Sequence, residues 1–369
     1  MAFFHDSADI YDRLRALSPQ QPVFSFQKHT LRFTFPGKTS RGTLWTRDIW
    51  ILKVSSALQP SVFGLGEVAP LPGLSKESPE EVEDALRLLC LDGQAWSQYL
   101  FDADRLPASV LFALEQALLD LHEGGRRILF PSKFTDGRDV ISINGLIWMG
   151  TSEEMFKRIQ EKLDLGFSCL KLKIGGLDWR EEKYLLDTLR AHYPPEILEI
   201  RLDANGAYSP RQAMKILEEL EPLGIHSIEQ PIQPGQWDAM SELCAHSPIP
   251  IALDEELIGC RTTDEMEALL EEVLPAYLIL KPTLLGGFQA GENWIRLAEM
   301  HGVDWWITSC LESNLGLNAI AQWAYTLQNP IPQGLGTGQV FSNNFPSPLH
   351  LDGPLLQMKP EQPWQLPVF

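Results

Sequence analysis

Three runs of residues near the amino terminus show the alternation of apolar and polar side chains that is typical of β-strands. They span Val23–Phe35, Thr43–Val54 and Val62–Val68. Pro36-Gly37 separates the first two runs, and a polar segment that contains proline separates the second from the third. The pattern therefore predicts an antiparallel meander with its first turn at Pro36-Gly37.

Two helices are expected after the meander. Ser78-Pro79-Glu80-Glu81 combines an N-cap serine, a proline at the first helical position and a capping-box glutamate, which predicts a helix to about Leu91. A second helix-periodic stretch, Ala108–His122, ends at Gly124-Gly125. We therefore expect residues 1–130 to form an α+β domain, in the place that the capping domain takes in the family named below.

Beyond residue 131, short β-like runs alternate with helical stretches at a nearly constant step, which is typical of βα units around a parallel sheet. The expected strands are Val140–Ile147, Ser168–Ile174, Leu198–Asp203, Ser227–Glu229, Ile249–Asp254, Tyr277–Lys281 and Trp305–Ser309. About seven such units and a last strand near Gly334 predict a modified (β/α)8 TIM-type barrel over residues 131–340. We expect the tail, residues 341–369, to pack back on the capping domain.

Composition and charge narrow the possible functions. The chain has 369 residues and a net charge of −19, which repels nucleic acid and anionic membrane surfaces. Five cysteines, an odd number without a C-x-x-C pair, suggest reduced thiols. The amino terminus has neither a basic region nor a long apolar stretch, so we expect a cytoplasmic protein.

Charged residues stand at the carboxyl ends of five successive expected strands. They are Lys171 and Lys173, then Asp203, Glu229 and Asp254, and finally Lys281. The steps from Lys173 along this series are 30, 26, 25 and 27 residues, so one βα unit separates each member from the next. Because barrel enzymes place their active sites at the carboxyl ends of the strands, we expect these side chains to meet there.

These residue types favour metal-assisted proton transfer on a small-molecule carboxylate. Asp203, Glu229 and Asp254 supply oxygen ligands only, which suits a hard cation such as Mg²⁺. A cation and one ammonium group can hold the negative charge that develops when the carbon beside a carboxylate loses a proton. A second lysine can serve as the base, so Lys173 and Lys281 are the candidate catalytic residues.

The motifs resemble the muconate-lactonizing subgroup of the enolase superfamily over nearly the whole chain. They are Lys171-Leu172-Lys173, Asp203-Ala204-Asn205, Glu229-Gln230-Pro231, Asp254-Glu255 and Lys281-Pro282. Within the subgroup, the o-succinylbenzoate synthase family is most similar in Ala69–Gly73, Arg201–Asn205, Ser309–Gly316 and Phe345–Leu349. This resemblance implies a Mg²⁺-dependent syn dehydration of 2-succinyl-6-hydroxy-2,4-cyclohexadiene-1-carboxylate to o-succinylbenzoate, in menaquinone or phylloquinone synthesis.

The resemblance also implies roles for single residues. The three carboxylates would bind the metal, Lys173 would take the proton and return it to the leaving hydroxyl, and Lys281 would stabilise the enediolate from the opposite face. The turn Ser309–Gly316 would offer backbone N–H groups to the succinyl carboxylate, and a loop of the capping domain would close over the site. The candidate substrate contacts are Lys171, Arg201, Asn144, Ser309, Leu71 and Gly73.

Two alternatives stay open. Arg201 lies two residues before Asp203 and can either contact substrate or pair with Glu199 inside the barrel. An N-acylamino acid racemase or a dipeptide epimerase would use the same metal and lysines. Epimerases of this family usually carry Asp-x-Asp near the last barrel strand, whereas residues 334–338 here contain no acid, which favours the dehydration.

Overall fold

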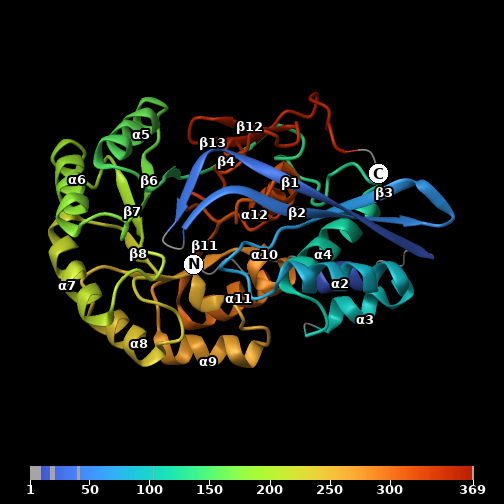
Figure 1. The fold of residues 1–369 in the computed structure, drawn as a ribbon, viewed down its shortest axis with the longest axis horizontal. Coiled ribbons are helices and arrows are strands. Elements are labelled where there is room, and N and C mark those ends of the chain that lie inside the picture. Colours follow the sequence, from blue (N-terminus) through green and yellow to red (C-terminus); the bar gives the residue numbers. More distant parts are fainter. Residues whose placement is uncertain (1–9, 17–20, 40–41, 103, 368–369) are drawn as a thin grey trace.

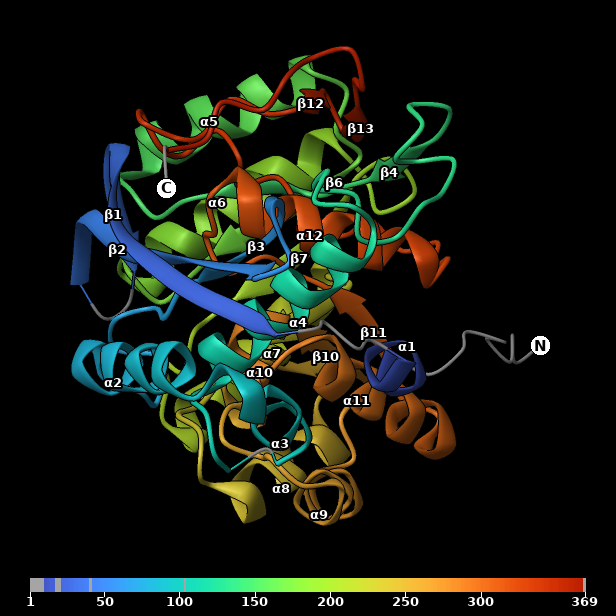
Figure 2. The same ribbon diagram turned by 90° about the vertical axis from the view of Figure 1, so that its right-hand side faces the viewer.

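An antiparallel sheet and a parallel sheet divide the fold into two parts. The structure is a computed structural model that describes residues 10–16, 21–39, 42–102 and 104–367. Helices α5 to α9 form an arc along one side of the molecule, and strands β1 to β3 lie with helices α2 to α4 on the other side (Figure 1). Figure 2 shows the same two parts from the end at which β1 to β3 lie.

The amino-terminal sheet confirms the expected meander. Its strands β1 (Pro22–Thr39), β2 (Gly42–Ser56) and β3 (Gln59–Val68) pair antiparallel in sequence order. The turn expected at Pro36-Gly37 was wrong, because β1 continues to Thr39 with a register shift between Arg32 and Gly37. A proline is tolerated there because β1 is an edge strand, where a missing N–H need not remove a ladder hydrogen bond.

Helices cover this sheet and complete the amino-terminal domain. Both expected helices are confirmed, as α2 (Pro79–Leu91), which begins with the Ser78/Glu81 capping box, and α4 (Ala108–His122). Two shorter helices, α1 (Ile10–Ala16) and α3 (Trp96–Phe101), and the 3-10 turn η1 (Gly93–Ala95) accompany them.

The barrel contains seven parallel strands in the order β11-β10-β9-β8-β7-β6-β5. They are β5 (Gly145–Ile147), β6 (Cys169–Lys173), β7 (Glu199–Asp203), β8 (Ser227–Glu229), β9 (Ile251–Leu253), β10 (Tyr277–Leu280) and β11 (Asp304–Ile307). Its helical elements are α5 (Ser152–Asp164), α6 (Trp179–His192), α7 (Pro210–Leu220), η2 (Glu221–Leu223), α8 (Trp237–His246), η3 (Glu255–Leu257), α9 (Thr263–Val273), α10 (Pro282–Leu285), α11 (Phe288–His301) and α12 (Asn314–Thr326).

Two expectations about the barrel strands need correction. The run Val140–Ile147 is not one strand, because β4 (Val140–Ser142) leaves the barrel and pairs with the tail, and only β5 joins the parallel sheet. The strand expected near Gly334 is reduced to single bridges. Gly334 bridges to Thr308, and Gln333 bridges to Ile143, so this short segment connects the two edges of the sheet.

The tail, residues 341–369, touches both parts of the fold. Its hairpin, β12 (Leu349–Asp352) and β13 (Leu355–Met358), pairs with β4, while Phe341 bridges to Phe33 of β1. The division into domains at residues 130 and 340 stays a prediction.

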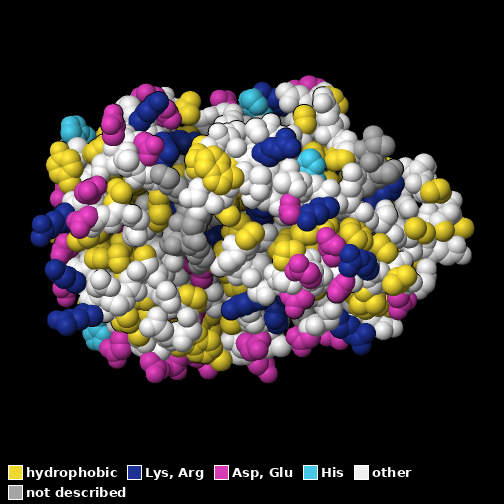
Figure 3. All heavy atoms as spheres, viewed as in Figure 1, with side chains coloured by type: hydrophobic (Ala, Val, Ile, Leu, Met, Phe, Trp, Pro, Cys, Tyr) yellow, Lys and Arg dark blue, Asp and Glu magenta, His cyan; other side chains and the backbone are white. Residues whose placement is uncertain are grey.

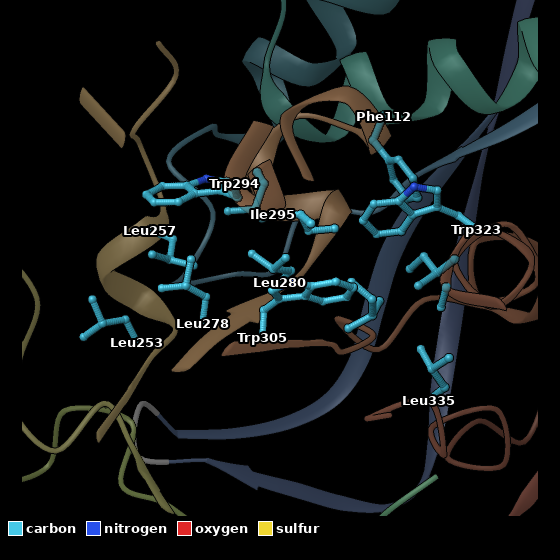
Figure 4. Packing of buried hydrophobic residues seen from close by; sticks show 14 of the residues in the cluster. Phe112, Leu253, Leu257, Leu278, Leu280, Trp294, Ile295, Trp305, Trp323 and Leu335 are labelled. Atoms are coloured by element: carbon cyan, nitrogen blue, oxygen red, sulfur yellow. The ribbon is translucent and has the colours of Figure 1, made fainter. Parts of the chain in front are cut away.

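Buried apolar side chains join strands to helices throughout the barrel. Figure 4 shows Trp294 and Ile295 of α11 near Leu278 and Leu280 of β10. At the junction with the amino-terminal domain, the ring centre of Phe288 lies 5.0 Å from that of Phe112 of α4 and 5.5 Å from that of Trp323 of α12. Acidic and basic side chains are interspersed on the face in Figure 3. Among the helices that the structure describes, none has both the length and the apolarity needed to span a bilayer.

Helix α4 approaches strand β3 so closely that two positions on the strand require glycine. A Cβ atom at Gly66 would lie 1.9 Å from the carbonyl oxygen of Ala113, and one at Gly64 would lie 1.8 Å from that of Ala117. We expect Gly66→Ala to lower the free energy of unfolding by at least about 2 kcal/mol, because helix and strand must separate. Urea unfolding measures this loss.

Gly302→Ala is the matched control. Gly302 has a φ of 70°, but a Cβ atom at this position would meet no other atom within 4 Å, so its substitution tests backbone strain without a clash. We expect Gly302→Ala to lower the free energy of unfolding by about 1 kcal/mol. Equal losses in the two variants would contradict the close contact between α4 and β3.

Candidate active site

A pocket lies at the carboxyl ends of the barrel strands, where the sequence places the charged residues. Its charged lining residues are Lys171, Lys173, Lys281 and Asp203. Its polar lining comes from Asn144, Asn205, Thr308, Ser309 and Thr337, and its apolar lining comes from Leu71, Leu74, Leu146, Trp148, Cys310 and Leu311, with Gly334 and Gly336 between them. The charged lining residues are thus three lysines and one aspartate, and the rest of the lining is neutral.

Strand register brings the charges together. Lys173 of β6 pairs with Asp203 of β7, and Asp203 pairs in turn with Glu229 of β8. Asp254 follows the end of β9 and Lys281 follows the end of β10. All five side chains therefore stand at one end of five neighbouring strands.

Ion pairs join the lysines and carboxylates into one chain of contacts. Lys171 Nζ lies 3.0 Å from Asp203 Oδ2 and 2.5 Å from Glu229 Oε2. Lys281 Nζ donates to Asp254 Oδ2 and lies 3.8 Å from Glu229 Oε1. The three carboxylates are at most 2% exposed, so each needs these cations to offset the loss of hydration.

The charged forms of the cluster depend on this mutual attraction. Burial raises the pKa of Asp203, but the ammonium groups of the three lysines outweigh it and hold this pKa well below its usual range. Burial and the charge of Asp203 raise the pKa of Glu229. Burial lowers the pKa of Lys281, but Asp254 and Glu229 outweigh it and hold this pKa well above its usual value. Lys281 is therefore a fixed cation.

Lys173 differs from Lys171 and Lys281 in that one of its partners is a neutral amide, Asn205, rather than a carboxylate. Its Nζ donates to Asp203 Oδ2 at 2.9 Å and to Asn205 Oδ1 at 2.8 Å. An amine nitrogen has three positions besides its bond to carbon, so these two bonds leave one position for a molecule in the pocket. In a neutral amine, that position holds the lone pair that can accept a proton.

Neutral polar groups line the barrel side opposite the carboxylates. Asn144 is 3% exposed, and its Oδ1 has no hydrogen-bond partner among the residues that the structure describes, as is also true of Thr308 Oγ1. Ser309 Oγ bonds to the carbonyl oxygen of Gly334 at 3.1 Å and lies 2.7 Å from Thr337 Oγ1. The structure thus places Asn144 and Ser309 in the pocket, where sequence predicted them, and adds Thr308 and Thr337.

The loop after β3 closes one side of the pocket. Leu71 lines the pocket and packs with Leu74 against a buried cluster of Ile258, Leu284 and Cys310. Gly73 has a φ of 76° and lies in a tight turn in which the N–H groups of Leu74 and Ser75 donate to the carbonyl oxygen of Leu71. Gly73 does not line the pocket. Gly73 therefore shapes the loop, whereas Leu71 faces the ligand space.

Comparisons with known proteins agree with this geometry. A family model described as enolase C-terminal domain-like matches residues 154–359. An o-succinylbenzoate synthase from Desulfotalea psychrophila is 44% identical, with 90% of this chain and 98% of that protein covered. The chain belongs to the enolase superfamily.

Solved structures of the superfamily have the same fold. A crystal structure of MenC from Desulfotalea psychrophila is 40% identical, has a TM-score of 0.81 and covers 92% of this chain and 100% of its own. A Bacillus subtilis L-Ala-D/L-Glu epimerase is 22% identical, with a TM-score of 0.80 and coverage of 92% and 96%, so this second likeness shows the fold alone. The seven-stranded parallel sheet is therefore the barrel sheet of the enolase superfamily.

Enolase-superfamily sites use divalent metal ions, and the three carboxylates fit this requirement in their chemistry. They are buried, come from adjacent strands and offer only oxygen, and Glu229 Oε1 is buried with no hydrogen-bond partner within the described ranges. As these side chains stand, no group of three or more His, Cys, Asp and Glu residues in the described part of the chain is arranged to hold a metal. The ammonium groups of Lys171 and Lys281 instead bridge the carboxylates.

Arg201 does not line the pocket, so the structure favours the ion pair among the two alternatives for this residue. Its Nε donates to Glu199 Oε1 at 2.7 Å, its Nη1 donates to the carbonyl oxygen of Pro332 at 2.9 Å, and its guanidinium lies 4.3 Å from the Trp306 ring centre. The alternative of an ion pair inside the barrel therefore describes this residue.

The turn Ser309–Gly316 also differs from expectation. Several of its backbone N–H groups are already bonded within the protein, because Glu67 of β3 accepts from Ser313 and Gly316, and Glu312 accepts from Cys310. Asn314 N–H donates to Asn344. These four N–H groups are therefore not available to a substrate carboxylate.

Two further residues of the site, Asn205 and Trp148, had no role predicted from the sequence. Asn205, which bonds to Lys173, has a φ of 46°, a conformation that asparagine adopts more readily than most residues. Its position two residues after Asp203 was the available signal. Trp148 lines the pocket and packs edge-on against Phe35 of β1 at 5.7 Å, a contact between residues too distant in sequence for a local pattern to reveal.

The position of Arg201 predicts a structural role. We expect Arg201→Met to lower the free energy of unfolding by about 2 kcal/mol, because it leaves a partly exposed Glu199 without its partner. Thermal and urea unfolding measure this loss. Binding of small carboxylates in the pocket, followed by calorimetry, is expected to stay the same. Weaker ligand binding with unchanged stability would restore Arg201 to the substrate contacts.

Proposed function

We propose that this chain is an o-succinylbenzoate synthase. It would catalyse the syn dehydration of 2-succinyl-6-hydroxy-2,4-cyclohexadiene-1-carboxylate to o-succinylbenzoate, with Mg²⁺ as cofactor. The reaction belongs to menaquinone or phylloquinone synthesis, and we expect it in the cytoplasm. The lining of the pocket is the observation that carries this proposal, supported by the 44% identity to a synthase.

The lining favours a dianionic substrate over a dipeptide. Three lysines line the pocket, and Asp203 is the only carboxylate among its lining residues in the described part of the chain. That carboxylate is already paired with Lys171 and Lys173. A dipeptide would bring a free ammonium group with no acid to receive it, whereas the succinyl carboxylate would meet neutral groups such as Asn144 and Thr308.

Lys173 and Lys281 suit the two roles that the dehydration requires. They come from β6 and from the end of β10, with three strands between them, so they face the pocket from different sides of the barrel. The free position on Lys173 would take the proton beside the carboxylate and then return it to the hydroxyl on the same face, which leaves as water. Lys281, a fixed cation, would stabilise the enediolate.

Asp203, Glu229 and Asp254 would hold Mg²⁺, which when bound supplies positive charge to the substrate carboxylate. Lys171 would then be free to bind that carboxylate, because its present partners are two of the proposed ligands. Burial of these groups away from water strengthens each charge interaction in the site.

Substitution of the two lysines tests the mechanism. Loss of ultraviolet absorbance by the diene measures turnover. We expect Lys173→Ala and Lys281→Ala each to lower kcat by a factor of about 10² to 10⁴, the usual contribution of general acid–base or electrostatic groups. Lys173→Arg is expected to be as inactive as Lys173→Ala, because a guanidinium cannot accept the proton. Lys281→Arg, which keeps the charge, is expected to retain part of the activity.

Lys183→Ala is the control, because Lys183 pairs with Asp187 on the outer helix α6. Circular dichroism checks that each variant is folded. Near-normal turnover in folded Lys173→Ala or Lys281→Ala would refute the two-lysine mechanism.

Substitution of the carboxylates tests the metal site separately. We expect Asp203→Asn and Asp254→Asn to weaken Mg²⁺ binding at least about tenfold, measured by calorimetry without substrate. Asp304→Asn, an exposed acid at the opposite end of strand β11, serves as the control and should bind Mg²⁺ normally. Unchanged affinity in Asp203→Asn or Asp254→Asn would show that the metal binds elsewhere.

A further inference from the structure

Arg47 is a buried cation at the junction of the amino-terminal domain and the barrel. It lies on β2 and is 1% exposed. Its Nη1 donates to the carbonyl oxygens of Cys310 and of Leu311, the latter at 2.6 Å, and its Nη2 donates to the carbonyl oxygen of Ala69. One guanidinium therefore binds backbone oxygens from two segments more than 200 residues apart in sequence.

Both segments form the wall of the pocket. Ala69 directly follows β3 and begins the loop that carries Leu71 and Leu74 into the lining. Cys310 and Leu311 line the pocket themselves. Leu71 and Leu74 also pack against the apolar cluster that contains Cys310, so Arg47 fixes the backbone on both sides of this part of the pocket wall.

The conformation of the turn explains why it needs a fixed partner. Leu311 has a φ of 61°, in the left-handed region that is unfavourable for a leucine. A buried carbonyl oxygen without a donor is also costly. Arg47 satisfies the carbonyls on both sides of this strained position with a planar group whose N–H donors have fixed directions.

We propose that Arg47 is a positioning residue for substrate binding, because it holds the loop after β3 and the Cys310–Leu311 turn at the separation that closes the pocket. It touches none of the lysines and carboxylates of the charged cluster in its hydrogen bonds. Its loss should therefore weaken substrate binding more than it slows the chemical step. The kinetic part of this inference rests on the proposed function.

Arg47→Met tests the proposal by two independent measurements. Hydrogen exchange, measured without substrate, reports on the amides of Leu71, Leu74 and Ser75, which are hydrogen-bonded within the loop. We expect these amides to exchange at least about tenfold faster in the variant. In the dehydration assay we expect KM to rise at least about tenfold while kcat changes less than about threefold.

Glu115→Gln is the matched control. Glu115 is equally buried at the same domain junction, where it accepts the N–H of Phe288, but neither residue lines the pocket. We expect normal exchange in the loop and a normal KM for this variant. Arg47→Lys keeps the charge without the planar set of donors, so we expect loop exchange and KM to rise as they do in Arg47→Met. This variant replaces Arg47→Met in the test if Arg47→Met does not fold.

Unchanged loop exchange in a folded Arg47 variant would overturn the proposal, and so would an equal change in Glu115→Gln. If the chain proved not to dehydrate the proposed substrate, the exchange result would still decide whether Arg47 holds the loop. A larger effect on kcat than on KM would also contradict a role in positioning the pocket wall.

Discussion

Burial of opposite charges at one end of the barrel is the constraint on which the rest of the structure depends. Asp203, Glu229 and Asp254 are almost completely buried, and isolated carboxylates could not remain ionised there without nearby cations. Lys171 and Lys281 provide those cations from strands on either side. The strands must therefore keep their register, because a shift by one residue would turn each inward charge toward the helices. The same charges that the fold must balance are those that the proposed chemistry uses.

The amino-terminal domain is attached to this barrel by buried polar side chains as well as by apolar packing. Glu67 of β3 caps the amino terminus of α12, and Glu115 of α4 accepts the first N–H of α11. Carboxylates are favourable at helix amino termini, where backbone N–H groups lack partners. Arg47 adds the converse contact, a cation on backbone carbonyls of the barrel. Glu67 and Glu115 thus join the two parts of the fold, whereas Arg47 binds the start of the loop that carries Leu71 into the pocket lining.

The sequence predicted the charged cluster well because each member follows an apolar strand at the spacing of one βα unit. Strand ends converge in a parallel barrel, so local position was enough to bring Asp203 and Lys281 to one site. It failed where the outcome depends on distant partners. The turn Ser309–Gly316 was expected to offer backbone N–H groups to substrate, but Glu67, 246 residues away from Ser313, accepts those of Ser313 and Gly316. Arg201 could have contacted either substrate or Glu199, and in the structure it pairs with Glu199 and lies over the ring of Trp306 of β11. The break between β4 and β5 arises because the tail pairs with β4, which no local pattern reveals.

We propose that three lysines around buried carboxylates, with neutral walls beyond them, select a dianionic substrate for dehydration. The most direct measurement offers the purified protein the cyclohexadiene carboxylate, N-succinylamino acids and dipeptides in parallel in D₂O, with Mg²⁺ and then with a chelator. We expect Mg²⁺-dependent loss of the diene at a kcat/KM far above that of any exchange of the α-proton in dipeptides. Exchange of dipeptide α-protons without dehydration would contradict the proposed dehydration and would assign the same lysines to an epimerase.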